Sequence, residues 1–401
     1  MSSRARALVA AATVIWLIVA IIATPHVFRF AAGITEQLTA GSFYEPPDRV
    51  PPGDPGEIVR SMRLTGSPLG STAWRVIYHS RDLDDRDILV SGLVIAPTGP
   101  APAGGRPIVS WAHPTTGSAP DCAPSRELDP YLLIEGLRRM LDAGFVVAAT
   151  DYPGMGLPAP DSYLVGISEG NSVLDAARAA RSLVEDGSDR LLLWGHSQGG
   201  QAALFAAQSA PDYAPELDLV SVAVAAPATD LSVLLADDID DVSGVTIGSY
   251  AFSAYSQVYG HPLDTILTPA AIERLPEMNS LCLLTRTSEL HRIGQPLVGH
   301  FLAADPSETE PWASLLAENS PGAAPIHAPL LVVQGEADTL IRPQSSADFV
   351  SHACAIGTPA RYLPVPGATH GSIALRTAGT VVRWFQDALA GDELPTSCRA
   401  A

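Results

Sequence analysis

The sequence predicts an α/β fold, in which helices cover both faces of a mainly parallel central sheet. Short apolar runs with the pattern of buried strands alternate with helical patterns over residues 107–226 and again over 329–390. This rhythm stops at 230–324, which is too long and too apolar for a bare loop and is predicted to be a helical cap or lid insertion over the sheet. Residues 57–229 and 325–401 then form the core.

The composition supports one large folded core. The chain has 401 residues, of which 47% are hydrophobic, so it can bury an extensive interior without depending on disulfides or metal ions for its stability. Its formal net charge is -19 and all its basic residues are arginines, with no basic stripe along the sequence. Phosphates would be repelled by such a surface, which argues against nucleic acids and anionic lipid surfaces as partners.

The N-terminus has the pattern of an export segment. Residues 1–6 carry Arg4 and Arg6, and 7–24 form an almost wholly apolar run of the length of a transmembrane anchor or a long signal peptide. No small-x-small cleavage signal follows at once, which favours an anchor with the arginines inside and the rest of the chain outside. Residues 25–56 form a Pro-rich lead-in, so we expect an exported protein, secreted or anchored in the cell envelope.

The expected elements follow in order along the chain. Strands are predicted at 75–81 and 88–97 as an antiparallel edge, and then at 107–111, 145–150, 191–194, 219–226, 329–334 and 361–365. Helices are predicted at 127–143, 171–184, 201–210, 344–355 and from the loop at 366–371 to residue 390.

The chain is organised around the pentad Gly195-His196-Ser197-Gln198-Gly199, which lies between a buried strand and an Ala-rich helix. Such a Gly-x-Ser-x-Gly turn between strand and helix is a nucleophile elbow, in which the serine takes a strained backbone conformation. The residues two before and two after the serine must therefore be nearly free of side chain, as Gly195 and Gly199 are. Ser197 is the candidate nucleophile.

A serine hydroxyl needs a base within hydrogen-bond reach and an acid that orients the base. His370 is the candidate base among ten histidines, because it lies in a Gly-flanked loop after the final strand. Asp338 follows a strand and a glycine turn and is the candidate acid, with Glu336 as its rival. The order Ser197, Asp338, His370 is that of the α/β-hydrolase fold.

Acyl transfer also needs hydrogen-bond donors for the oxyanion. One is the backbone N–H of the residue after the nucleophile, Gln198. The second should come from the loop that follows the strand at 107–111, where Thr115 and Thr116 are both candidates and the sequence does not choose between them.

These residues resemble the secretory, or Candida-type, lipases of the α/β-hydrolase superfamily. The resemblance runs from about residue 43 to 398 and includes the Ser197 elbow and the Asp338 and His370 loops. The other motifs that carry it are Phe43-Tyr44, Asp121-Cys122-Ala123-Pro124-Ser125, Asp151-Tyr152 with Gly154 and Gly156, Glu169-Gly170 and Tyr213-Ala214-Pro215-Glu216-Leu217.

The resemblance implies hydrolysis of carboxylic esters, including triacylglycerols, with no cofactor and no metal. It also implies a helical lid at 230–324 and the disulfides Cys122–Cys282 and Cys354–Cys398, which agrees with the pairing expected of four cysteines on an exported chain. The chain departs from the pattern at Thr116, where an acidic residue can occur, and it matches poorly between residues 243 and 311.

The sequence thus predicts an exported serine carboxylic-ester hydrolase that forms an acyl-enzyme on Ser197, with a small-molecule ester or lipid as substrate. Two alternatives share this chemistry, an acyltransferase and a prolyl-type peptidase. An alternative of another class is a non-catalytic cell-envelope protein that keeps the fold as a binding scaffold.

Overall fold

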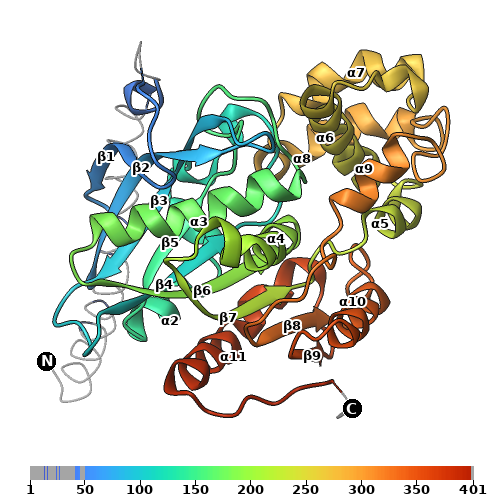
Figure 1. Cartoon of the computed structure of the whole chain (residues 1–401). Helices are drawn as coiled ribbons and strands as arrows, with labels where there is room; N and C mark the ends of the chain where they lie inside the picture. The colour runs from blue at the N-terminus through green and yellow to red at the C-terminus, as the bar shows by residue number, and fades with distance from the viewer. Residues whose placement is uncertain are drawn as a thin grey trace, which may run out of the picture.

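A single mixed sheet organises the computed structural model, which describes residues 13, 16, 24, 27, 41–45 and 50–398. Its nine strands lie in the order β1-β2-β3-β5-β4-β6-β7-β8-β9 (Figure 1). The strands are β1 Ile58–Leu64, β2 Ser71–Arg81, β3 Asp87–Pro97, β4 Arg106–Ala112, β5 Val146–Thr150, β6 Gly187–His196, β7 Asp218–Ala225, β8 Leu330–Gly335 and β9 Ala360–Val365.

The sheet has an antiparallel edge and a parallel body, as predicted. β1, β2 and β3 pair antiparallel, and β3 also pairs antiparallel with β5. All pairs from β5 across to β9 are parallel. β4 and β5 are buried along their whole length, because helices cover both faces of the parallel body.

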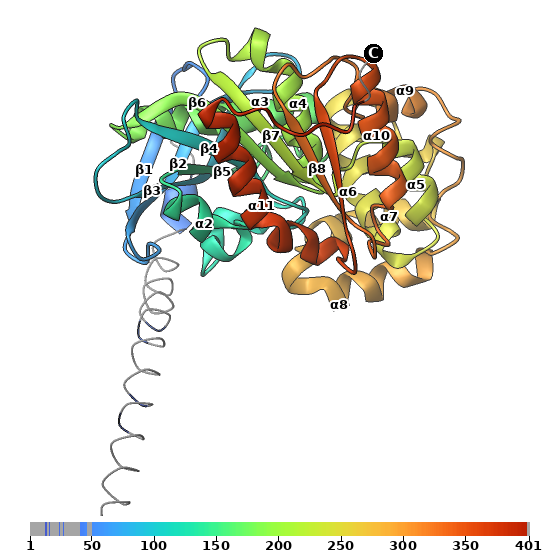
Figure 2. The same ribbon diagram turned by 90° about the horizontal axis from the view of Figure 1, so that it is seen from below.

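Helices pack on both faces of this sheet (Figure 2). Side chains of α3 Gly166–Leu183, α4 Gln198–Tyr213 and α10 Pro343–Ala355 share one buried cluster with the strands. Side chains of α2 Leu137–Asp142 and α11 His370–Ala390 belong to the cluster on the opposite face. The predicted α/β fold is therefore confirmed.

The largest side chains of the core pack next to the site. Trp111 of β4 and Trp194 of β6 are paired in register, with ring centroids 5.6 Å apart. Their indole N–H groups donate to the carbonyl oxygens of Leu133 and Glu135, at 3.1 and 2.9 Å. Each buried indole thus keeps a hydrogen-bond partner, and together they attach the segment before α2 to the sheet.

Two predicted helices have other bounds in the structure. The helix predicted at 127–143 was wrong in its first half, which contains only the 3-10 turn η3 Pro130–Leu133 before α2 and follows another such turn, η2 Pro124–Arg126. The physical reason is Gly136, whose φ of 88° is left-handed and separates η3 from α2. The helix predicted at 171–184 begins earlier, at Gly166, because its polar first turn hid the start of the apolar pattern.

Between β7 and β8 the chain is mainly helical and contributes no strand to the sheet, and we call this segment the helical insertion. It contains α5 Leu231–Asp238, α6 Val242–Tyr259, η4 Leu263–Thr265, α7 Pro269–Asn279, α8 Leu283–Gly294, η5 Gln295–Leu297 and α9 Trp312–Glu318. One isolated antiparallel bridge joins Leu267 to Leu302 within it. Aromatic side chains such as Tyr250, Phe252 and Trp312 are buried there, so the insertion has a packed interior continuous with the sheet.

Both disulfides implied by the resemblance are present. Cys122–Cys282 joins the segment after β4 to the residue before α8, and it closes a loop with a sequence separation of 160 residues. By loop-closure entropy a crosslink of this span stabilises the fold by about 5 kcal/mol. Cys354–Cys398 attaches the C-terminal segment to α10. The first bond therefore fixes the helical insertion to the edge of the site.

The apolar run at 7–24 lies outside the described residues except for residues 13, 16 and 24. None of the helices in the described part of the chain has the length and the hydropathy of a membrane span.

Candidate active site

Ser197 stands at the sharp turn between β6 and α4. Its φ of 58° and ψ of -117° are strained for a residue with a side chain, and its N–H donates to the carbonyl of Ala225 on β7 at 2.9 Å. A Cβ at Gly199 would lie 1.9 Å from the carbonyl oxygen of Ala112, and a Cβ at Gly195 would lie 2.0 Å from that of Gly199. Both glycines are thus required by close backbone approach, as the sequence argument expects.

A hydrogen-bonded chain runs from this serine through an imidazole to a carboxylate. Nε2 of His370 lies 2.9 Å from Oγ of Ser197, and Nδ1 of His370 lies 2.8 Å from Oδ2 of Asp338. The structure therefore brings together three side chains that are far apart in sequence. One detail of the prediction was wrong, because His370 is the first residue of α11 rather than part of a loop. Thr369 caps this helix in a capping box with Ser372.

The carboxylate of Asp338 is held in place by its own turn. Its Oδ1 accepts from the backbone N–H groups of Leu340 and Ile341, at 3.0 and 2.9 Å. Its Oδ2 accepts from His370 and also lies 3.3 Å from the side-chain nitrogen of Gln334. The rival acid Glu336 is exposed, so Asp338 alone has the geometry to orient the imidazole.

The structure distinguishes Thr115 from Thr116, the two threonines considered as oxyanion donors. Thr115 lines the pocket at Ser197, together with Gln198. Thr116 is buried away from the pocket, since its hydroxyl donates to the carbonyl of Cys122 at 2.9 Å and its carbonyl accepts from the N–H of Leu283 at 2.8 Å. Gln198 is the first residue of α4, where a backbone N–H has no partner inside the helix.

A second histidine supports the site and was not identified from the sequence. His196 is buried directly before Ser197, and its Nδ1 lies 2.8 Å from Oε2 of Glu135. Its Nε2 lies 3.1 Å from the backbone carbonyl oxygen of His370. His196 therefore fixes the start of α11 against the elbow. The position of His196 inside the Gly-x-Ser-x-Gly pentad could have identified it in the sequence, whereas nothing in the sequence distinguishes Glu135.

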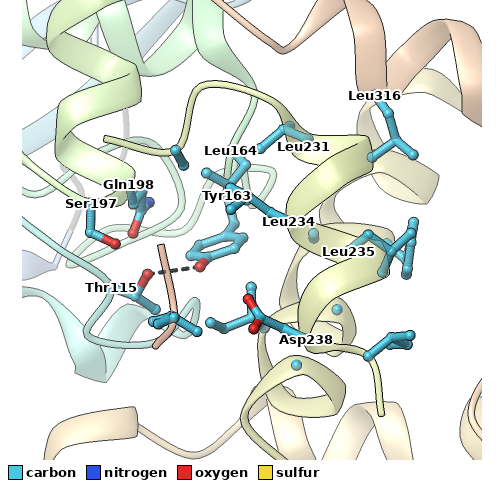
Figure 3. Close-up of a pocket in the computed structure, with 18 of the residues that line it drawn as sticks. Thr115, Tyr163, Leu164, Ser197, Gln198, Leu231, Leu234, Leu235, Asp238 and Leu316 are labelled. Carbon is cyan, nitrogen blue, oxygen red and sulfur yellow. Dashed lines mark hydrogen bonds between the residues drawn. The ribbon is translucent and has the colours of Figure 1, made fainter. Parts of the chain in front are cut away.

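An apolar pocket opens beside Ser197 (Figure 3). Ser197, Gln198 and Thr115 lie on one side of it, and α5 of the helical insertion lies on the other. The side chains that line it are mainly aliphatic and aromatic. Those from α5 and α6 include Leu231, Leu234, Leu235, Ile247, Ala251 and Phe252. The Tyr163 hydroxyl lies 2.7 Å from that of Thr115 at the edge of the pocket. The pocket beside Ser197 therefore suits a ligand with an apolar group.

Glu169 is a buried carboxyl group beneath the elbow, at the start of α3. Its Oε1 accepts from the side-chain amide of Gln198 at 2.7 Å and from the N–H of Leu164 at 2.9 Å. Its Oε2 has no partner among the described residues. Burial raises the pKa of Glu169 to about 8, against which the hydrogen bond from Gln198 acts. This carboxyl is therefore largely protonated at neutral pH.

Glu169→Gln is expected to make the free energy of unfolding fall less steeply with rising pH than it does in the wild-type protein. A raised carboxyl pKa in the folded state favours folding below the unfolded-state pKa of about 4, and this contribution is lost as the pH rises through the folded value. The melting temperature of the wild-type protein should therefore fall between about pH 5 and pH 8 more steeply than that of Glu169→Gln, as measured by differential scanning calorimetry.

The matched control for that experiment is Glu185→Gln, which removes one carboxyl from the exposed surface. Its melting temperature should follow the wild-type slope. Equal slopes for Glu169→Gln and the wild-type protein would show that Glu169 is ionised in the folded state.

No group of three or more His, Cys, Asp or Glu side chains within the described ranges could hold a metal ion.

The comparison with protein families gives a direct result. The family model for secretory lipases matches residues 132–396, which is more than half of the chain.

The chain belongs to the secretory lipase family.

Other relatives agree with this assignment. The chain is 25% identical over 381 residues to a probable inactive lipase of Mycobacterium tuberculosis, covering 88% of this chain and 82% of the relative. It is 24% identical over 391 residues to lipase A of Arthroderma benhamiae, covering 90% of this chain and 81% of the relative. Among solved structures, Candida antarctica lipase A in its closed state has a TM-score of 0.73 at 17% identity, covering 89% and 87%. This last likeness shows the fold.

Several of the sequence motifs on which the resemblance rests have a structural part in the molecule. The Asp151 carboxylate, fully buried, accepts from the N–H of Ser125 at 2.8 Å and from the hydroxyl of Ser91 at 2.6 Å. The hydroxyl of Ser125 also bonds to Asp151 and lies 2.6 Å from that of Tyr44. Burial raises the pKa of Asp151, and these hydrogen bonds lower it. The network fastens the segment before β1 to the core.

Proposed function

We propose that this secretory lipase is a serine hydrolase of carboxylic esters, with substrates whose acyl group is apolar. One observation carries the proposal. The hydrogen-bonded chain Ser197–His370–Asp338 stands at the mouth of a pocket whose walls are mainly aliphatic. Family membership supports the same reaction class.

The first half of the proposed reaction acylates the enzyme. Oγ of Ser197 attacks the ester carbonyl carbon while Nε2 of His370 takes the hydroxyl proton. The tetrahedral intermediate then collapses, its bond to the alcohol oxygen breaks, and His370 gives its proton to the departing alkoxide. Asp338 accepts from Nδ1–H throughout, which keeps Nε2 free to accept and stabilises the imidazolium.

The second half releases the acid. A water molecule attacks the acyl carbon, and His370 takes a proton from it. When the bond to Oγ breaks, the same proton returns to Ser197 and the carboxylic acid leaves. In both halves the negative oxygen of the intermediate accepts from the backbone N–H groups of Gln198 and Thr115, which we propose as the oxyanion hole.

We propose that the helical insertion acts as the cap over this site and binds the acyl chain, with 230–324 as its extent and 57–229 and 325–401 as the core. The aliphatic residues of α5 and α6 that line the pocket support this division. We also propose that the protein is exported, and the description of the family as secretory supports that.

The test is ester hydrolysis by the purified full chain. We expect turnover of p-nitrophenyl acetate, hexanoate and decanoate, with release of the free acid, and of an emulsified triacylglycerol followed by acid titration. Folded protein that hydrolyses none of them would contradict the proposal and favour the non-catalytic scaffold. A product that is mainly a new ester when glycerol is added would identify an acyltransferase instead.

A further inference from the structure

One carboxyl group interrupts the apolar face of α5 that lines the pocket. Leu231, Leu234, Leu235 and Asp238 occupy positions i, i+3, i+4 and i+7 of this helix, so they share one face. All four line the pocket. Figure 3 shows the side chain of Asp238 projecting from the end of α5 into the pocket, on the side opposite Gln198. Asp238 thus occupies a position at which the amphipathic pattern of α5 predicts a fourth apolar residue.

The neighbouring aspartates have partners that Asp238 lacks. Asp237 forms an ion pair with Arg342 at 2.6 Å, and Asp241 accepts from two backbone N–H groups at the start of α6. Asp240 is exposed to solvent. Asp238 is only 8% exposed, and no described residue donates a hydrogen bond to its side chain. Arg342, the cation of the described chain that acts on Asp238, is therefore already paired with Asp237.

This placement is costly for the folded protein. The pKa of Asp238 is raised to about 7, and burial is the largest cause. Repulsion by the carboxylates of Asp241, Asp237 and Asp338 adds to it, whereas the positive charge of Arg342 lowers the pKa. The residue also ends α5, where the helix dipole disfavours a negative charge. A buried carboxyl that accepts no hydrogen bond from the described residues is a candidate for contact with a ligand.

We propose that Asp238 is a specificity-determining residue of the acyl pocket, which selects esters whose acyl chain carries a hydroxyl group over esters with a plain saturated chain. This inference rests on the proposed function. A hydroxyl can donate to the carboxylate and accept from the neutral acid, so it satisfies Asp238 in either state. A plain chain buries the same carboxyl without a partner. An ammonium group would lose far more hydration than a hydroxyl in so apolar a pocket.

The experiment compares kcat/KM for p-nitrophenyl decanoate with that for monohydroxydecanoyl esters in which the hydroxyl moves along the chain. For the wild-type protein one position of the hydroxyl should be preferred over decanoate by roughly tenfold, the size of one hydrogen bond to a charged group. Asp238→Leu should abolish this preference and favour decanoate instead. Asp238→Asn, which still donates and accepts, should retain part of it.

Asp240→Asn is the matched control, since it removes one exposed carboxyl of the same segment and should leave every ratio unchanged. A second readout needs no substrate: the melting temperature of Asp238→Asn should rise relative to wild type as the pH increases from about 4 to about 7, because the raised pKa makes ionised Asp238 destabilising.

The outcomes separate this inference from the proposed function. If the wild-type protein hydrolyses the acetate ester but Asp238→Leu has the same hydroxyl-to-plain ratios as wild type, Asp238 does not contact the acyl chain and the inference is wrong. If the wild-type protein hydrolyses no ester, the proposed function fails and this inference fails with it.

Discussion

Ser197→Ala is expected to lower kcat for p-nitrophenyl ester hydrolysis by about 10⁵-fold or more, close to the effect of losing a whole catalytic triad. The reason is that Oγ of Ser197 is the atom that the base faces, at 2.9 Å from Nε2 of His370. The measurement is steady-state hydrolysis with an active-site titration, so that traces of contaminating esterase are recognised.

The fold should survive this substitution. Alanine has to adopt the same positive φ as Ser197, and the elbow glycines on either side remain. Circular dichroism and the melting temperature should therefore match wild type within a few degrees. A folded Ser197→Ala protein that kept wild-type kcat would show that another residue is the nucleophile.

Asp338→Asn is expected to lower kcat by about 10⁴-fold, because it places the imidazole in the wrong tautomer. The backbone N–H groups of Leu340 and Ile341 require an acceptor at the position of Oδ1. The amide NH₂ must then stand at the position of Oδ2, facing Nδ1 of His370. Nδ1 would have to accept, Nε2 would carry the proton, and the base could no longer receive the proton of Ser197.

Glu336→Gln is the matched control, since this exposed carboxyl lies two residues away on the same turn. It should retain kcat within about twofold, the scatter expected of a surface change. The opposite pattern, a severe loss in Glu336→Gln and none in Asp338→Asn, would reassign the orienting acid. The pH dependence of kcat/KM in each variant reports whether the free enzyme still uses the same base.

The sequence predicted the parts of the fold that depend on local pattern. Buried runs such as 145–150 and 219–226 became β5 and β7 within one residue, because strands covered on both faces are continuously apolar. The elbow was recognisable for the same reason, since its glycines are fixed by the turn itself. The prediction of a helix at 127–143 was wrong in its first half. The amphipathic pattern there does not show that Gly136, with its left-handed φ, interrupts the helix.

The supporting residues of the site could not be predicted, since their partners come from distant segments. Glu135 faces His196 across 61 positions, and Glu169 faces Gln198 across 29. Glu135 looks like an ordinary surface glutamate in the sequence, and Glu169 was noted only in the motif Glu169-Gly170, which does not identify its partner. Asp238 was hidden for another reason: its segment has several aspartates, and only the folded structure shows which one enters the pocket.

The most direct test of the central claim, that Ser197 is an activated nucleophile, is mass spectrometry of the purified protein after treatment with a fluorophosphonate. We expect a single adduct that maps to the peptide containing Ser197, and none in Ser197→Ala. Absence of the adduct from folded wild-type protein, or an adduct on another residue, would contradict it.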